Sequence, residues 1–387
     1  MSLTVRTVSS ASDIEAARWD QCANPQSQAY HPLLRHDFFV ALETSGSATA
    51  NTGWVACHQI VQDGADILGV MPLYLKTHSQ GEYVFDFAWA DAFERAGGRY
   101  YPKLLSAIPF SPVTGPRLLI RSPERLEEIE ASLLAGALNL LEEHHLSSLH
   151  INFIEEALWH RLGNQGFLRR KDQQFHWQND GYMCFDQFLD ALNARKRKNL
   201  RKERARALAN NITVDWVTGE ALTPAHWDDF YRFYLDTGRR KWGSPYLTRA
   251  FFDEIHHRMP EDILLIMAQR DGRYIAGALN FIGGDVLYGR NWGCIEDHPF
   301  LHFELCYYQA IDFAIAHGLS IVEAGAQGAH KIARGYAPRP TYSAHYIAHD
   351  GFREAVSHYL ESEREYVDND ISELSKLAPF KHSVEDE

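Results

Sequence analysis

The chain has 387 residues, of which 45% are hydrophobic and 23% charged, and its formal net charge is −13. This length exceeds one ordinary core and predicts two domains, while the composition excludes disordered, collagen-like and low-complexity proteins. No apolar run is long enough to span a membrane, and residues 1–20 lack the apolar core of a secretory signal. The five cysteines are scattered without a CxxC pair, which argues against a disulfide framework or structural zinc. We therefore expect a cytoplasmic protein without stable membrane insertion.

The sequence repeats itself across its two halves. HPLLRHDFFVAL (31–42) and SPYLTRAFFDEI (244–255) share a proline, a leucine and a phenylalanine pair at the same spacing. Further matches in the same order pair 63–64 with 271–272, 81–89 with 284–292, 146–147 with 319–320, and 166–177 with 335–346. Matches in constant order indicate a duplicated unit. Matched positions are 203 residues apart in the third match and 173 apart in the fourth. We therefore expect about thirty extra residues in the first copy near 96–122.

The elements predicted in chain order are those of a mixed α/β (α+β) fold. The first copy has a helix at 126–145 and a buried strand at 148–154, and a long helix is predicted over 185–211. The second copy is predicted to contain helices at 226–242 and 248–259, three strands within 262–292 with a tight turn at 270–272, a helix at 302–318, a strand at 320–326, a short helical turn at 330–336 and a strand at 341–348. A strand meander followed by helical crossovers predicts a mixed sheet in each copy. We place the first domain at 1–180, the linking helix at 181–211 and the second domain, with a short acidic tail, at 212–387.

The predicted linking helix is strongly basic. Residues 195–206 carry eight Lys or Arg side chains and one acid, Glu203. In a chain of net charge −13, such a run indicates a surface for the phosphates of a nucleic acid, a nucleotide carrier or a lipid head group. The alternative is a strut that pairs with acidic neighbours.

Several segments resemble one protein family. RKRKNLRKERARA (195–207), FYLDTGRRKWGSPYLTRAFF (233–252), PVTGPRLL (112–119) and EAGAQGAHKIARGY (323–336) are similar to segments of FemAB-like proteins of peptidoglycan biosynthesis or recognition. The resemblance covers nearly the whole chain and implies two tandem domains of the GCN5-related N-acetyltransferase (GNAT) fold. It also implies transfer of an acyl or aminoacyl group from acyl-CoA or aminoacyl-tRNA to an amine, without a permanently bound cofactor.

One departure from this fold concerns the donor. Acyl-CoA users carry a glycine-rich loop after the fourth strand, whose backbone N–H groups hold the pyrophosphate. At that place the chain reads CIEDHPFLHFE (294–304), with no glycine and three carboxylates that repel phosphate. This favours aminoacyl-tRNA as the donor, with the tRNA at the basic helix 195–206.

The resemblance places the reacting site where the fourth and fifth strands of the second copy separate. Glu323 is the first candidate for general base because burial on an apolar strand raises a carboxyl pKa; the alternative is a structural Glu323 paired with Lys331 or Arg334. His330 is the second candidate base, and Lys331 and Asn291 complete the predicted catalytic group. The predicted substrate-binding residues around them are Arg290, Trp292, Gln327, Gly328, Arg334 and Tyr336.

Further binding candidates lie outside this site. Arg239, Arg240 and Trp242 combine cations with an indole that can hold a phosphate or stack on a base, or else are ordinary helix-end cations. The first copy contributes Arg99, Tyr101, Lys103, Arg117 and Asn152. Because that copy lacks the Glu and the glycine-rich loop, we expect it to bind donor or acceptor. Paired histidines are adjacent rather than i, i+4, so no metal site is predicted.

These observations predict an N-acyltransferase that acts on an amine acceptor such as a cell-wall or lipid precursor. Two alternatives stay open. One is a non-catalytic binding module of the same doubled fold that recognises such a precursor. The other is a long-chain N-acyltransferase in which aromatic residues of 83–110 line an acyl tunnel.

Overall fold

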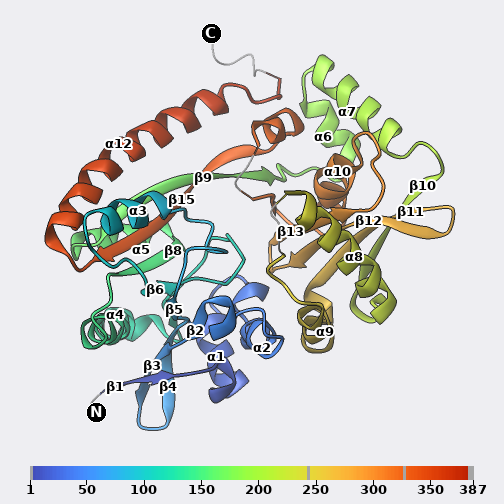
Figure 1. The fold of residues 1–387 in the computed structure, drawn as a ribbon. Coiled ribbons are helices and arrows are strands. Elements are labelled where there is room, and N and C mark those ends of the chain that lie inside the picture. Colours follow the sequence, from blue (N-terminus) through green and yellow to red (C-terminus); the bar gives the residue numbers. More distant parts are fainter. Residues whose placement is uncertain (1–2, 242–244, 326–327, 382–387) are drawn as a thin grey trace. The chain divides into compact units, whose positions relative to one another are not determined.

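A computed structural model describes residues 3–241, 245–325 and 328–381, and the chain divides into two compact units (Figure 1). Unit 1 comprises Met1–Asp172, Tyr246–Glu254 and Pro340–Asp368. Unit 2 comprises Gln173–Pro245, Ile255–Arg339 and Asn369–Glu387.

Unit 1 contains two groups of paired strands. The first is a four-stranded sheet in the order β1 (Thr4–Val8), β3 (His58–Asp63), β4 (Asp66–Met71) and β7 (Leu119–Ile120). The second runs in the order β15 (Ala337–Ile347, in this unit from Pro340), β8 (Ser148–Ile154), β6 (Lys103–Ser106), β5 (Tyr74–Lys76) and β2 (Trp54–Ala56). Strands β6 and β8 are parallel, whereas the other pairs of this group are antiparallel.

The helices of unit 1 are α1 (Ala16–Ala23), α2 (His36–Thr44), α3 (Phe87–Arg95), α4 (Leu126–Glu143), α5 (Glu156–Asn164) and the first part of α12 (Asp350–Ser375). Helix α4 packs on β3, β4 and β8. It does so because Leu133, Ala137 and Leu141 recur every four residues and form one buried apolar stripe. The helix and strand predicted at 126–145 and 148–154 are confirmed.

Unit 2 contains one sheet of paired strands. Its order is β10 (Ile212–Thr218), β11 (Ile263–Arg270), β12 (Arg273–Ile282), β13 (Val286–Cys294), β14 (Ile321–Glu323) and β9 (Leu168–Gln178). The turn between β11 and β12 has positive φ at Asp271 (51°) and Gly272 (78°), as a two-residue hairpin turn requires. The three predicted strands and their turn are therefore confirmed.

The helices of unit 2 are α6 (Phe185–Ala191), α7 (Ala194–Ala207), α8 (Pro224–Lys241), the last part of α9 (Arg249–Arg258, in this unit from Ile255), α10 (Leu301–Phe303), a π-helical turn (Glu304–Tyr308), α11 (Gln309–Ala316) and a 3₁₀ helix (Ala329–Arg334). Helix α8 lies against β12 and β13. The approach is so close at Gly293 that a Cβ there would lie 2.3 Å from the Phe233 backbone. Helix α11 packs on β13 and β14. The predicted helices and the short helical turn of this copy are confirmed.

The last strand of each sequence copy pairs within the other unit. Strand β9 follows the first copy, yet it pairs with β14 of unit 2, with His176 opposite Glu323. Strand β15 follows the second copy and pairs with β8 of unit 1, with His345 opposite His150. Residues 166–177 and 335–346, matched in the sequence, thus occupy corresponding strands.

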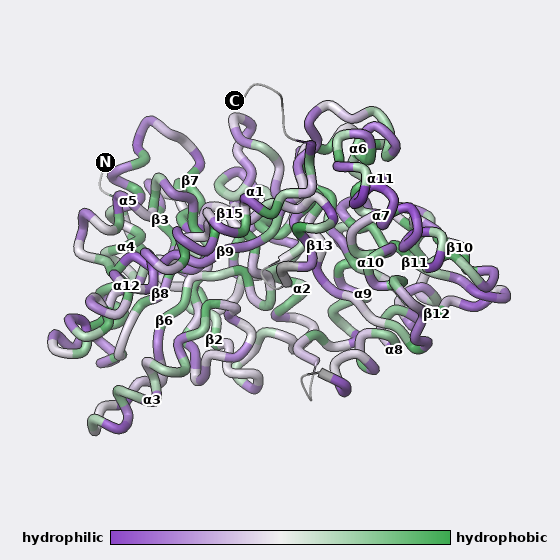
Figure 2. Tube along the Cα trace, turned by 90° about the horizontal axis from the view of Figure 1, so that it is seen from above, coloured by the Kyte–Doolittle hydropathy of each residue, from purple (hydrophilic) through white to green (hydrophobic). Residues whose placement is uncertain are grey.

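Two expectations from the sequence are wrong. The region 185–211 is not one long helix, because extended backbone at Leu192 separates α6 from α7, and the Asn193 side chain caps α7 by accepting from the Lys196 N–H. The match of 81–89 with 284–292 is not structural, since the first segment leads into α3 and the second contains β13. Coloured by hydropathy, α7 is mostly hydrophilic (Figure 2).

Candidate functional site

A pocket of about 120 Å³ opens in unit 2 where two parallel strands separate. Pairing of β13 with β14 ends at Tyr288 opposite Glu323, and β13 then continues paired with β12 only. The pocket is lined by Ala278, Leu279, Asn280, Gly289, Arg290, Asn291, Trp292, His302, Cys306, Tyr307 and Ala324. This is the location that the sequence predicted, between the fourth and fifth strands of the second copy.

A β-bulge shapes the wall of this pocket. Leu279 pairs with Asn291 and Asn280 pairs with Gly289, so Arg290 is the extra residue of β13. A bulge redirects side chains and ends regular pairing, which is why bulges occur beside binding sites. Gly289 is needed at this point because a Cβ there would lie 3.0 Å from the Glu323 carbonyl oxygen. Arg290, Asn291 and Trp292, all predicted site residues, lie along the pocket.

Glu323 ends β14 beside the pocket. Its side chain is buried, and its Oε1 lies 3.8 Å from Nε2 of His176 on β9. Burial, together with Arg339 and Lys331, lowers the pKa of His176 to about 4. His176 is therefore neutral near pH 7, and its imidazole can accept a proton without first losing one.

Lys331 closes the loop that follows β14. Its ammonium donates to the carbonyl oxygens of Ala324 and Gly325, the latter at 2.9 Å, and its side chain is buried. Burial lowers the pKa of Lys331 to about 8, with a further lowering by Arg290 and an opposing effect of Cys306. An ammonium has three N–H donors, so two carbonyl bonds leave one for a ligand oxygen.

His330 lies on the exposed side of the same loop. Its Nε2 is 3.1 Å from the Tyr307 hydroxyl, which belongs to the pocket wall. Burial, Arg334 and Lys331 lower the pKa of His330. Gly328, at φ 106°, cannot carry a side chain because a Cβ would lie 2.3 Å from this imidazole. Gln327 falls outside the described residues.

Arg334 and Tyr336 are packed inside the unit, which corrects their predicted place in a ligand-facing cluster. Arg334 is 5% exposed, donates to Glu203 at 2.7 Å and lies over the Phe303 ring at 3.5 Å. Tyr336 is buried edge-to-face against Tyr307. Both side chains support the pocket wall rather than facing a ligand.

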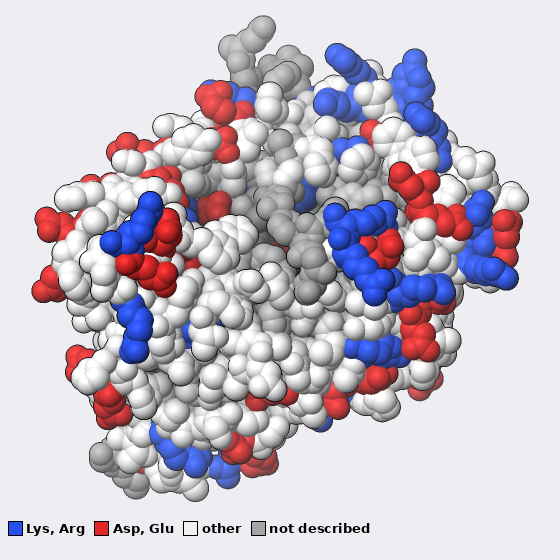
Figure 3. All heavy atoms as spheres, in the orientation of Figure 1, with Lys and Arg blue, Asp and Glu red and all other residues white. Residues whose placement is uncertain are grey.

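The cations of α7 divide between two roles. Arg204 pairs with Glu304 at 2.8 Å and Asp312 at 2.7 Å, while Arg197 and Arg201 pair with acids of α6. The pairing with acidic neighbours considered for this helix is therefore present within unit 2, while Arg195, Lys198 and Lys202 have no ion-pair partner among the described residues. Lys and Arg side chains gather over α7 at the upper right of Figure 3.

The remaining predicted sites of unit 2 do not converge on the pocket. Arg239 is exposed near the end of α8, and Arg240 donates to the carbonyl of Cys294 at 2.7 Å. Trp242 falls outside the described residues. Two of the three carboxylates predicted to repel a CoA phosphate have partners, since Glu296 pairs with Arg270 and His298 and Glu304 pairs with Arg204.

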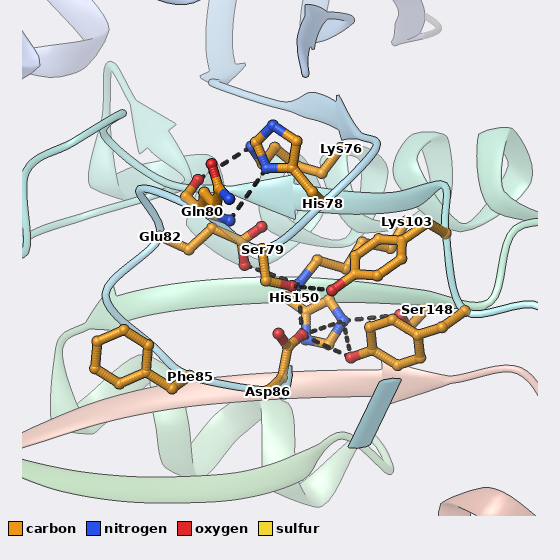
Figure 4. Close-up of polar contacts among 12 residues, drawn as sticks. Lys76, His78, Ser79, Gln80, Glu82, Phe85, Asp86, Lys103, Ser148 and His150 are labelled. Carbon is orange, nitrogen blue, oxygen red and sulfur yellow. Dashed lines mark hydrogen bonds and ion pairs between the residues drawn. The ribbon is translucent and has the colours of Figure 1, made fainter. Parts of the chain in front are cut away.

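Unit 1 contains a buried ionisable cluster around Lys103, shown in Figure 4. The Lys103 ammonium donates to Ser79 and Glu82, both at 2.8 Å, and to Asp86. The close-up shows these three side chains turned toward the lysine, whereas Phe85 points away. Tyr101 joins the cluster through Ser79 at 2.7 Å, so the structure brings together two predicted residues, Tyr101 and Lys103.

The second layer of this cluster is a pair of histidines. Asp86 accepts from the Tyr100 hydroxyl at 2.6 Å and lies 3.9 Å from His150. His150 Nδ1 is 2.7 Å from His345 Nδ1. Burial lowers the pKa of both imidazoles, that of His150 to about 3, so both are neutral at pH 7. Burial also raises the pKa of Glu82 to about 7, against the opposing effect of Lys103.

The other three predicted residues of unit 1 lie apart from this cluster or serve the fold. Arg117 is fully buried and donates to the carbonyls of Val113 and Gly115, which closes the loop 113–117. Arg99 is exposed, and Asn152 is buried on β8.

Sequence reasoning missed the pocket residues Asn280, His302, Cys306 and Tyr307 and the cluster residues Glu82, Asp86 and His345. One signal was present, since Asn280 is the single polar residue of the apolar segment 275–282. Glu82 and Asp86 carried no signal, because the loop that brings them to Lys103 has no regular period.

Among the described residues, no group of His, Cys, Asp and Glu side chains is arranged to hold a metal ion. Nor does any described helix combine the length and apolar character of a membrane span.

Two α/β units with a pocket between diverging parallel strands have the architecture of the tandem GNAT fold. The chain belongs to the FemAB-like family of peptidoglycan biosynthesis/recognition, whose profile matches residues 10–382. The crystal structure of FemX is similar over 92% of this chain and 100% of that chain, with 14% identity and a TM-score of 0.56. The C-terminal domain of a candidate lysylphosphatidylglycerol synthetase from Agrobacterium fabrum is similar over 91% of this chain and 97% of that chain, with 10% identity and a TM-score of 0.56. The structure of a tandem GNAT protein from the clavulanic acid biosynthesis pathway is similar over 90% of this chain and 99% of that chain, with 13% identity and a TM-score of 0.48. No curated protein matches the sequence.

Proposed function

We propose that this protein transfers a small acyl or aminoacyl group to an amine of a cell-wall or lipid precursor. The observation that carries the proposal is the pocket at the end of the β13–β14 pair, which the amide of Asn291 lines. Glu323 directly precedes the lining residue Ala324, and the Lys331 ammonium donates to the Ala324 carbonyl oxygen. Membership of the FemAB-like family supports transferase chemistry, and the likeness to FemX supports the fold on which it would occur.

The chemistry is aminolysis of an ester or thioester. The acceptor nitrogen attacks the carbonyl carbon of the donor, and Glu323 takes the proton that the nitrogen loses. Asn291 and the third N–H of Lys331 donate to the oxyanion of the tetrahedral intermediate. The intermediate then collapses, the carbon–oxygen or carbon–sulfur bond breaks, and the leaving alkoxide or thiolate takes up the proton that Glu323 had accepted.

The pocket and α7 together favour aminoacyl-tRNA as the donor. A pocket of about 120 Å³ equals the share of roughly four liquid waters, which fits a short acyl group and not a long chain. The exposed cations of α7 suit a donor that carries many phosphates. The long-chain alternative, whose acyl tunnel was placed at 83–110, is not tested by this pocket, because the pocket is lined by residues 278–324.

The test supplies aminoacyl-tRNA and acyl-CoA separately, each with cell-wall and lipid amines, and follows amide formation by mass spectrometry. Glu323→Gln is expected to lower turnover about 100-fold while ligand binding stays within about twofold. Glu296→Gln is the matched control, because Glu296 pairs with Arg270 and His298 and, unlike Glu323, has no chain neighbour that lines the pocket. Equal turnover of Glu323→Gln and wild type would overturn the assignment of the base.

The family description includes recognition, which favours a binding module as the second candidate function. A pure binder would retain ligand affinity and form no amide with any donor, in the wild type as in Glu323→Gln. That result would replace the transferase proposal.

A further inference from the structure

Helix α7 has two opposite faces with different chemistry. Its exposed cations Arg195, Lys198, Lys202 and Arg206 are spaced by three or four residues and so form one stripe. At the helical rise this stripe is roughly 16 Å long, enough to meet several successive phosphates of one strand. Within the part of the chain that the structure describes, Arg195, Lys198 and Lys202 have no ion-pair partner.

The opposite face of α7 is bonded to the interior of unit 2. Leu200 and Ala207 are buried there. Between them, Glu203 accepts from Arg334 at 2.7 Å and from the Tyr308 hydroxyl at 2.5 Å. The next residue, Arg204, pairs with fully buried Glu304.

The hydrogen bond between Glu203 and Tyr308 and the ion pair between Arg204 and Glu304 both end on the π-helical turn Glu304–Tyr308. This turn forms part of the pocket wall. Glu304 and Tyr308 are its first and last residues, and Cys306 and Tyr307 between them line the pocket. A π turn has hydrogen bonds one residue longer than those of an α-helix, is rare, and occurs mostly at functional sites. Helix α7 therefore holds the pocket wall at both ends.

We infer that Glu203 and Arg204 are positioning residues that couple a nucleic acid bound on the outer stripe of α7 to the shape of the pocket. Phosphates on the stripe fix α7, and α7 fixes the π turn through these two side chains. Such coupling is reciprocal, so a ligand in the pocket also tightens nucleic-acid binding. The inference rests on the proposed function only in taking this pocket as the reacting site.

The test measures hydrogen–deuterium exchange of the full-length protein with and without a saturating short RNA duplex. We expect the duplex to slow exchange in α7 and, by about threefold or more, in residues 301–308. In Glu203→Gln the duplex should still bind within about twofold, but exchange in 301–308 should no longer respond. Arg197→Gln, which breaks the ion pair with Asp190 at the side of α7, is the matched control and should respond like the wild type.

Two further variants keep the test decisive. Tyr308→Phe removes one hydrogen bond to Glu203 without changing charge, and it should weaken the response if Glu203→Gln does not fold. Replacing Lys198 and Lys202 by Glu should abolish duplex binding, while single neutral changes should each lower the salt dependence of log Kd by about one.

Three results would overturn the inference. One is a bound duplex that leaves exchange in 301–308 unchanged in the wild type, and another is a Glu203→Gln response equal to that of the wild type. The third is binding to phosphatidylglycerol vesicles but not to the duplex, which would make the stripe a membrane surface. Because hydrogen–deuterium exchange needs no turnover, the test of this coupling gives the same outcome whether or not the protein has transferase activity.

Discussion

Lys76 and Lys103 lie directly opposite each other on β5 and β6, and both are fully buried. Like charges opposite each other destabilise a sheet, so the pair needs compensation. Glu82 and Asp86 compensate the charge of Lys103 and together raise its pKa against the lowering effect of burial. Lys76 instead lies 3.6 Å from the Trp54 ring centroid, and burial lowers its pKa to about 7. At neutral pH Lys103 is thus fully protonated, whereas Lys76 is only about half protonated.

This difference predicts unequal losses of stability from the same substitution. Lys103→Met leaves two buried carboxylates without their cation and should destabilise the protein by about 3–5 kcal/mol. Lys76→Met removes a charge that has no carboxylate within bonding distance among the described residues, so it should cost less than about 1.5 kcal/mol. Urea denaturation of both variants and the wild type measures the contrast. Equal losses would contradict the role assigned to Lys103.

The buried histidine pair predicts acid sensitivity of unit 1. His150 and His345 face Asp86, Lys103 and Arg170, and their folded pKa values lie below that of an unfolded histidine. Between pH 6.5 and about 3, the unfolded chain binds protons that the folded chain does not. Stability is therefore lost as the pH falls, by roughly 2 kcal/mol at pH 5 for His150 alone.

The measurement is the pH dependence of the unfolding free energy in His150→Gln against the wild type. The variant should flatten the dependence between pH 7 and 5 by about one proton. Glu82 acts in the other direction, because its raised folded pKa adds stability as the pH falls toward 4.5. This opposing effect is common to both proteins and cancels in the difference. His160→Gln, at an exposed histidine of unit 1, should leave the dependence unchanged.

Lys331 sets the alkaline limit of the proposed reaction. Its pKa of about 8 means that the ammonium, and with it a donor to the oxyanion, is lost above that pH. Turnover should fall above pH 8 in the wild type, and Lys331→Arg should move the fall to higher pH because arginine stays protonated. Rate–pH profiles of the two proteins test this. A common alkaline limit would exclude Lys331 from the reacting group.

In the proposed reaction, we expect Trp292 to limit the size of the acyl group. Its indole lines a pocket of about 120 Å³, so Trp292→Ala should enlarge the pocket and favour longer acyl groups by about tenfold in relative kcat/KM. Trp216→Ala is the control, because Trp216 packs on Phe313 and His317 and does not line the pocket. An unchanged preference in Trp292→Ala would place the acyl group elsewhere.

The sequence was most informative where structure is periodic. The apolar spacing of α4 and the Asp271-Gly272 turn predicted their elements well, because local propensity and burial act together there. The region 185–211 was misjudged because one capping residue, Asn193, outweighs a helical pattern that is favourable on both sides.

The site was predicted in part for a similar reason. Arg290, Asn291 and Trp292 follow one another on β13, so the strand alone brings them to the pocket. Arg334 was expected to face a ligand, but its partner Glu203 lies on a helix 131 residues away in sequence. Contacts between residues that lie far apart in the chain produce no periodic pattern in the sequence.

The crossed strands β9 and β15 have a consequence for biosynthesis. Unit 1 needs residues 340–347 to complete the pairing of β8, so most of its sheet is synthesised long before its partner strand leaves the ribosome. During that interval His150 has no histidine opposite it, and the edge of β8 is open. A ribosome stalled before residue 340 would therefore hold an incomplete first unit that is prone to aggregate, and neither half of the gene would yield a stable protein by itself.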